Sequence, residues 1–147
     1  MQGTLLLSRL CILPAAVATI ALSSAAAIAQ VYSPIPLQHN REITDTLSDK
    51  DIPTGFGGFA RDYTIFLESG DQVAIDVISD EFDTLVTLMN KDGTTVGEND
   101  DGPDGTTNSL LFARITESGM YTVRVRSYAG QGTGTFRLKV ARLRAVQ

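Results

Sequence analysis

Alternation of apolar and polar residues with a period of two is the feature that most constrains the fold of this chain. Its clearest example is Met120–Tyr128, where apolar side chains alternate with threonine and arginine. Successive side chains of a β-strand point to opposite faces of a sheet, so this pattern predicts a strand with one buried face. After residue 30 no segment carries a convincing helical period. The segments that we predict as strands are Ile43–Leu47, Asp62–Ser69, Gln72–Ser79, Thr84–Met89, Thr94–Val96, Ser109–Ile115, Met120–Tyr128 and Thr135–Leu143.

The spacing of these segments predicts an all-β fold. Short strands separated by turns rich in Gly, Asp and Ser are typical of an antiparallel β-sandwich or jelly roll. We expect the core to be formed by the apolar side of each strand. Its predicted members are Tyr63, Ile65, Leu67, Val73, Ile75, Val77, Val86, Leu88, Tyr121, Val123, Val125, Phe136, Leu138 and Val140.

The N-terminus has the pattern of a signal peptide. A singly basic segment, Met1–Arg9, precedes the apolar Leu10–Leu22, and the small-x-small sequence Ala27-Ile28-Ala29 follows. We therefore predict cleavage before Gln30 and a secreted or periplasmic protein. An uncleaved membrane anchor is the alternative, because the uncharged run is long enough to span a bilayer. Its alanines and serines favour cleavage, which would leave no membrane span.

The predicted organisation is a signal peptide at residues 1–29, an extended leader at 30–41 and one β-sandwich domain at 42–147. The leader contains Pro34 and Pro36, which favour extended backbone. Cys11, the single cysteine, falls within the signal peptide, so the mature chain would be stabilised without disulfides.

The residue types needed for catalysis are scarce. The chain lacks a Gly-x-Ser-x-Gly segment, and its one histidine, His39, lies in the predicted leader. Removal of Cys11 would leave no thiol nucleophile, and a zinc site of His and Cys ligands cannot be assembled. We therefore predict that the protein is not an enzyme.

Charge narrows the range of partners. The formal net charge is −5 and the pI is about 4.7, which argues against nucleic acid or an anionic membrane as the main partner. Four basic residues point outward from two strands that could pair, and they form a candidate ligand surface for an acidic polysaccharide or protein: Arg124, Arg126, Arg137 and Lys139. The alternative is that these charges protect exposed strands from edge-to-edge aggregation.

The loop after the strand Thr94–Val96 is dense in acidic residues and glycine. Calcium takes about six to eight oxygen ligands from carboxylates, amides, carbonyls and water. The candidate Ca²⁺ ligands are Asp83, Asn99, Asp100, Asp101 and Asp104. Their spacing is not that of an EF-hand. The alternative role is the capping of turns, because Asp and Asn side chains commonly hydrogen-bond nearby backbone groups.

The order of motifs from Asp62 to Val140 resembles the bacterial pre-peptidase C-terminal domain. The matching segments are Ser69-Gly70-Asp71, Phe82-Asp83, Val86 with Leu88, Asp92-Gly93, Glu98-Asn99-Asp100-Asp101, Ser109, Gly119–Val125 and Gly134-Thr135-Phe136. Phe136 stands where the family usually has tyrosine. The resemblance implies a jelly-roll sandwich, usually an accessory domain beside secreted peptidases and linked to secretion, attachment and sometimes calcium. No peptidase accompanies it here, so we expect a stand-alone module.

Together these observations predict an exported, non-catalytic accessory or binding module, with calcium as a candidate stabilising ion. Its expected ligand is an extracellular or envelope polysaccharide or a protein. The alternative is a structural partner that assists or stabilises a separately encoded exported peptidase.

Overall fold

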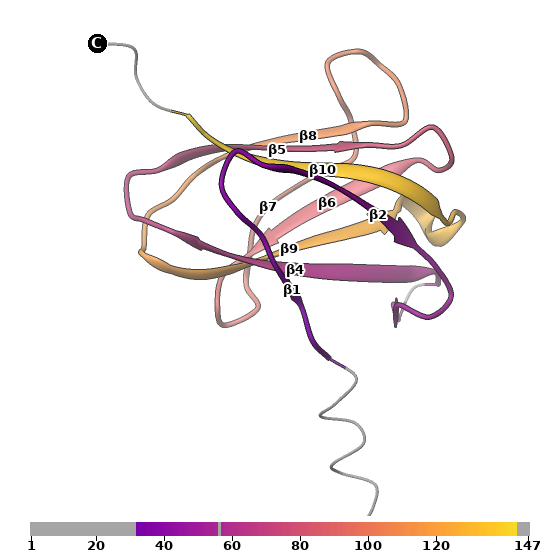
Figure 1. The fold of residues 1–147 in the computed structure, drawn as a ribbon, viewed down its shortest axis with the longest axis horizontal. Coiled ribbons are helices and arrows are strands. Elements are labelled where there is room, and N and C mark those ends of the chain that lie inside the picture. The colour runs from indigo at the N-terminus through magenta and orange to yellow at the C-terminus, as the bar shows by residue number, and fades with distance from the viewer. Residues whose placement is uncertain (1–31, 56, 144–147) are drawn as a thin grey trace, which may run out of the picture. The chain divides into compact units, whose positions relative to one another are not determined.

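The computed structural model describes residues 32–55 and 57–143, and these form two β-sheets packed face to face (Figure 1). The described part contains no α-helix, which confirms the predicted all-β sandwich. Its elements are β1 (Ile35–Pro36), β2 (Glu42–Leu47), β3 (Ile52–Pro53), β4 (Phe59–Leu67), β5 (Gln72–Ile78), β6 (Thr84–Met89), β7 (Thr95–Asn99), β8 (Ser109–Arg114), β9 (Gly119–Ser127), the 3₁₀ turn η1 (Tyr128–Gly130) and β10 (Gly134–Leu143).

The chain crosses between the two sheets several times, although the consecutive strands β3 and β4, and β6 and β7, pair within one sheet. The first sheet has the order β1-β4-β9-β6-β7, with β3 also paired to β4, and the second has the order β2-β10-β5-β8. The strand pairs are antiparallel except for β1 with β4. In Figure 1 the second sheet lies above the first, and β8 forms one of its edges.

Part of the predicted leader belongs to the first sheet. Ile35 and Pro36 pair in parallel with Tyr63 and Thr64 of β4, and the Leu37 amide donates to the Thr64 carbonyl at 2.8 Å. The side chains of Ile35 and Leu37 pack against the core. The segment therefore covers the part of this edge of β4 that β3 leaves unpaired. The predicted signal peptide lies outside the described residues.

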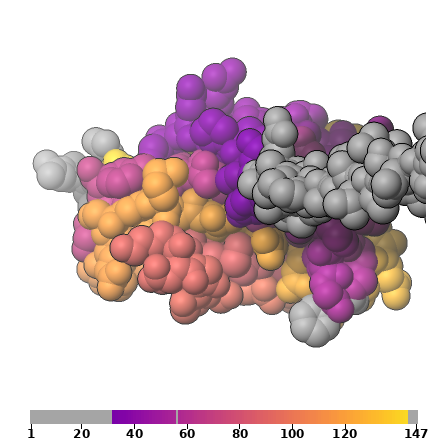
Figure 2. Space-filling view, turned by 90° about the horizontal axis from the view of Figure 1, so that it is seen from below, coloured from indigo at the N-terminus to yellow at the C-terminus, as the bar shows by residue number. Residues whose placement is uncertain are grey.

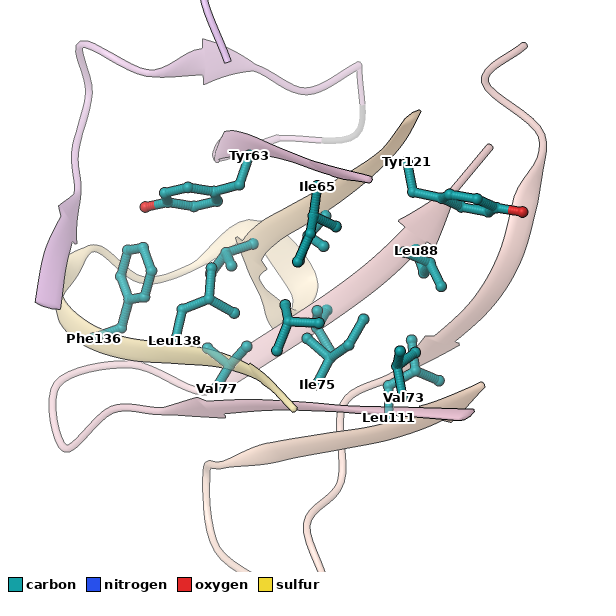
Figure 3. Packing of buried hydrophobic residues seen from close by; sticks show 14 of the residues in the cluster. Tyr63, Ile65, Val73, Ile75, Val77, Leu88, Leu111, Tyr121, Phe136 and Leu138 are labelled. Atoms are coloured by element: carbon teal, nitrogen blue, oxygen red, sulfur yellow. The ribbon is translucent and has the colours of Figure 1, made fainter. Parts of the chain in front are cut away.

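The core lies between the sheets, and its members confirm the predicted inward positions. Figure 3 shows side chains such as Ile65 and Leu88 from the first sheet meeting Ile75 and Leu138 from the second. Phe136 makes edge-to-face contacts with Tyr63 and with Phe82, at centroid distances of 6.3 and 6.1 Å. Aromatic pairs prefer this geometry because the positive ring edge meets the negative ring face. Among the described residues, no helix is long and apolar enough to cross a membrane.

Candidate binding site

The acidic loop between β7 and β8 is held by hydrogen bonds to its own backbone. The Asn99 side-chain amide donates to the carbonyls of Asp101 and Leu110 at 2.9 and 2.8 Å. The Asp101 carbonyl in turn accepts from the Leu110 amide at 3.1 Å. Asn99 and Asp101 therefore cap the first part of the free edge of β8.

Asp104 also caps a turn. Its carboxylate accepts hydrogen bonds from the Asn108 side chain at 3.1 Å and from the Thr106 amide at 3.3 Å. The Asn108 contact and then those of Thr106 lower the pKa of Asp104. These contacts, like those of Asn99, match the turn-capping alternative.

The other candidate calcium ligands are dispersed around this loop. Asp83 is exposed, and its carbonyl accepts from the amide of Tyr128 in η1 at 2.8 Å. Asp100 lies partly exposed at the end of β7. Across residues 32–55 and 57–143, no group of three or more His, Cys, Asp and Glu side chains is placed to hold a metal ion. Calcium binding by Asp83, Asn99, Asp100, Asp101 and Asp104 stays a prediction.

The predicted basic surface is divided between opposite faces of the sandwich. The strand β9 belongs to the first sheet and β10 to the second, so the two do not pair. Arg124 and Arg126 therefore lie on one outer face, and Arg137 and Lys139 lie on the other. The expectation of one continuous basic row was wrong, because the chain crosses between sheets after β9.

Most of these cations already face a carboxylate. Figure 2 looks onto the outer face of the first sheet, where orange β9 lies between β4 and the salmon β6 and β7. There Arg124 holds Asp62 through two contacts of 2.7 Å, and the Tyr32 hydroxyl donates to the same carboxylate at 2.9 Å. The contact with Asp62 raises the pKa of Arg124. Arg126 pairs with Glu98 at 3.2 Å.

On the second sheet, Arg137 lies 3.5 Å from Glu42, and Lys139 is flanked in the strand register by Glu42 and Asp76. Exposed pairs of this kind contribute little to stability, but they neutralise the local charge. The four basic residues, divided between two faces, therefore offer little free positive charge to an acidic polysaccharide.

A polar cluster that the sequence did not reveal joins the two sheets. Arg61 of β4 contacts Asp45 of β2 at 2.8 Å and Asp51 at 2.6 Å. The hydroxyl of the buried Tyr63 donates to Asp45 at 2.8 Å. Burial acts to raise the pKa of Asp45, but the hydrogen bonds from Tyr63, the Thr46 amide and Arg61 outweigh it and hold that pKa below its ordinary value. The cluster therefore links the two sheets.

A candidate binding surface lies on the outer face of the second sheet, beside β8. A groove of about 320 Å³ is lined by Gln72, Val73, Phe112, Ala113, Arg114 and Leu143. The strand register places Leu143, Gln72 and Arg114 in one row across three strands. Phe112 is 64% exposed and Leu143 is 44% exposed. We call this groove the β8 groove, and the side chains that matter for binding there are Phe112, Leu143 and Arg114. It combines apolar surface with a positive charge.

Sequence reasoning missed the β8 groove, although one signal was present. Phe112 occupies an outward position of a predicted strand, where the other strands mostly carry polar residues. Large exposed apolar side chains that gather in one place are typical of interaction sites. Leu143 and Arg114 could not be joined to Phe112 without knowing that β10, β5 and β8 are neighbours.

The comparisons with known proteins agree with the fold. No protein-family profile matches the chain, and no curated protein matches its sequence. The chain is similar in structure to the pre-peptidase C-terminal domain of a collagenase from Bacillus anthracis, with a TM-score of 0.57 and 15% identity over 74% of this chain and 94% of that domain. It is also similar to PliG of Aeromonas hydrophila, a periplasmic inhibitor of g-type lysozyme, with a TM-score of 0.52 and 14% identity over 74% of this chain and 96% of that protein. The chain therefore has the fold of a pre-peptidase C-terminal domain.

Proposed function

We propose that this chain is an exported, non-catalytic accessory module that binds another protein through the β8 groove. The observation that carries the proposal is the exposure of Phe112 and Leu143 next to Arg114 on one outer face. Burying such apolar side chains against a partner would contribute about 25 cal/mol per Å² of apolar surface. An arginine at the rim would add orientation and specificity.

The fold supports a role in protein binding. One protein of this fold is a domain of a collagenase, and another is an inhibitor of g-type lysozyme. The target of that inhibitor is itself a protein. Export of the present chain is part of the proposal, and its support is the N-terminal pattern that ends at Ala27-Ile28-Ala29.

A protein fits the surface better than an acidic polysaccharide does. Arg124, Arg126 and Arg137 are engaged by carboxylates, so the outer faces lack a continuous row of free cations. The β8 groove instead offers an apolar area with a single charge, which is the mixture found in the centre of many protein interfaces. A protein partner that is itself a separately encoded exported peptidase would unite this proposal with the alternative of an assisting role.

The test uses the protein recovered after export, whose mass should correspond to a chain beginning at Gln30. The wild type, a groove variant with Phe112→Ala and Arg114→Glu, and a control variant with Phe66→Ala and Arg137→Glu are immobilised. Phe66 and Arg137 are similarly exposed but lie away from the groove. Each is exposed to purified envelope polysaccharides, to a g-type lysozyme, to a secreted peptidase and to the exported proteins of its own host.

The expected result is retention of defined proteins by the wild type and the control, with loss of retention by the groove variant. Inhibition or stabilisation of the lysozyme or the peptidase would identify the mode of action. Retention of polysaccharide alone, or equal retention of proteins by all three variants, would contradict the proposal. Turnover of a substrate by the pure protein would contradict its non-catalytic part.

A further inference from the structure

The strand β8 lies at the edge of the second sheet and pairs with β5 on one side only. Its register with β5 determines which of its backbone groups point away from the sheet. The Ile115 amide donates to the Asp71 carbonyl at 2.8 Å, and the register continues with Ala113 opposite Val73 and Leu111 opposite Ile75. Alternate residues of an antiparallel edge strand direct their N–H and C=O groups away from the sheet. On β8 these are Leu110, Phe112 and Arg114.

The free edge is open at two of these three residues. The backbone groups of Leu110 are occupied by the Asp101 carbonyl and the Asn99 side chain. Within the described part of the chain, the backbone N–H and C=O groups of Phe112 and Arg114 have no hydrogen-bond partner. Proteins usually cover or protect such an edge, because it is a template for another strand. The acidic loop therefore closes one end of a short open segment.

The side chains at this open segment lie in the β8 groove. Phe112 and Arg114 are two residues apart, so both point to the outer face, where Leu143 lies in the same row as Arg114. Arg114 forms no ion pair with any residue of the described ranges. The same place thus presents unpaired backbone groups, an apolar surface and an unneutralised positive charge.

We propose that a partner protein adds a short extended strand to β8 at Phe112 and Arg114. This rests on the proposed function and specifies the chemistry of the partner. The added strand places a carboxylate against Arg114 and an apolar side chain against Phe112. Because side chains on one face of a strand recur every second residue, the partner segment reads acidic-x-apolar in an antiparallel pairing and apolar-x-acidic in a parallel one.

The backbone and the charge together select this occupant. Unpaired N–H and C=O groups along a strand are matched by the alternating donors and acceptors of a polypeptide. A second copy of this chain would present its own Arg114 at the same edge, so self-pairing would bring two positive charges to one short segment. The charge therefore favours a different protein with an acidic segment.

The experiment begins with the selection of displayed random peptides on the exported wild-type protein. A selected peptide is then synthesised together with a twin that is N-methylated at the residue facing Phe112. Affinity is measured for the wild type, Phe112→Ala, Arg114→Glu and the control Phe66→Ala. Amide hydrogen exchange of Leu110, Phe112 and Arg114 is followed by NMR with and without the peptide. Sedimentation of the protein alone reports self-association.

The expected peptides share the acidic-x-apolar or apolar-x-acidic pattern. Phe112→Ala and Arg114→Glu should each weaken binding about tenfold or more, and Phe66→Ala should not. Bound peptide should slow the exchange of the Phe112 and Arg114 amides about tenfold or more, with little change at Leu110, and the N-methylated twin should bind about tenfold more weakly. These changes report new backbone hydrogen bonds, which contact by side chains alone would not produce.

Two outcomes would overturn the inference separately from the proposed function. If peptides or captured proteins depend on Phe112 and Arg114 while the two amides exchange at an unchanged rate and the twin binds equally well, strand addition is wrong and groove binding stands. If the protein self-associates and Phe112→Ala abolishes that association, the occupant of the edge is a second copy of this chain and not an acidic partner. If Phe112→Ala and Arg114→Glu leave the affinity for peptides and proteins unchanged, both the inference and the proposed function fail.

Discussion

Replacement of Tyr63 by phenylalanine tests whether the polar cluster between the sheets stabilises the fold through the charge of Asp45. Tyr63 is fully buried, and its hydroxyl donates to Asp45 at 2.8 Å. The substitution removes that donor and keeps the ring that packs against Phe136. The expected loss therefore comes from one hydrogen bond to a charged acceptor.

The magnitude follows from the type of hydrogen bond. Bonds to charged groups contribute about 1.5–3 kcal/mol, so Tyr63→Phe should lower the free energy of unfolding by about 2 kcal/mol at neutral pH. For a domain of about a hundred residues this corresponds to a fall in melting temperature of about 8–15 °C. Arg61 and the Thr46 amide still bind Asp45 in the variant, so the carboxylate is not left without a partner.

The loss should depend on pH. The pKa of Asp45 is lower in the folded protein than in the unfolded chain. Its ionisation therefore contributes stability above the unfolded pKa, about pH 4, and that contribution disappears as the pH falls through the folded value. Below that folded pKa the Tyr63 hydroxyl faces a neutral carboxyl group, so the loss should shrink to about 1 kcal/mol.

Urea denaturation at neutral pH and at an acidic pH below the folded pKa of Asp45 measures both values. Tyr121→Phe is the matched control, because the buried Tyr121 hydroxyl donates to the neutral carbonyl of Glu117 at 2.7 Å. That variant should lose about 1 kcal/mol at both pH values. An equal loss for Tyr63→Phe at the two pH values would refute the role that we assign to the charge of Asp45.

Three further substitutions test other parts of the structure by urea or thermal denaturation. Asp62→Asn should lower the free energy of unfolding by about 2–3 kcal/mol. This is less than for a fully buried ion pair, because the side chain of its partner Arg124 is 32% exposed. A loss below about 0.5 kcal/mol would contradict this. Gly58→Ala should lower the free energy of unfolding by more than about 1 kcal/mol, because φ is +74° and a Cβ would lie 2.7 Å from the backbone of Gly130 in η1. Its control is Gly119→Ala, where a Cβ would meet no atom within 4 Å and the stability should hardly change. Asn99→Asp removes the donor to two carbonyls and should cost about 1–3 kcal/mol. Recovery of that loss by millimolar Ca²⁺ would support the predicted calcium site, and a stable variant would argue against the capping role.

The strands and the core were predictable because both depend on local alternation. The buried side of Met120–Tyr128 follows from its own residues, since a period of two assigns each side chain to one face of a sheet. The same reasoning identified the inward positions of β4, β5 and β10, all of which are buried. Turn residues such as Ser69-Gly70-Asp71 then marked where the strands end.

The alternation of apolar and polar residues does not predict which strands pair with each other. The candidate sites depend on this pairing. Arg124 meets Asp62 across 62 positions of sequence, and β9 and β10 lie in different sheets although they are consecutive. The β8 groove likewise needs β10, β5 and β8 side by side. By itself the sequence determined an all-β sandwich and the residues that face its core. The tertiary structure alone decided which outward residues share a face and which edge stays open, because long-range pairing is selected by the packing of the whole domain and not by any single strand.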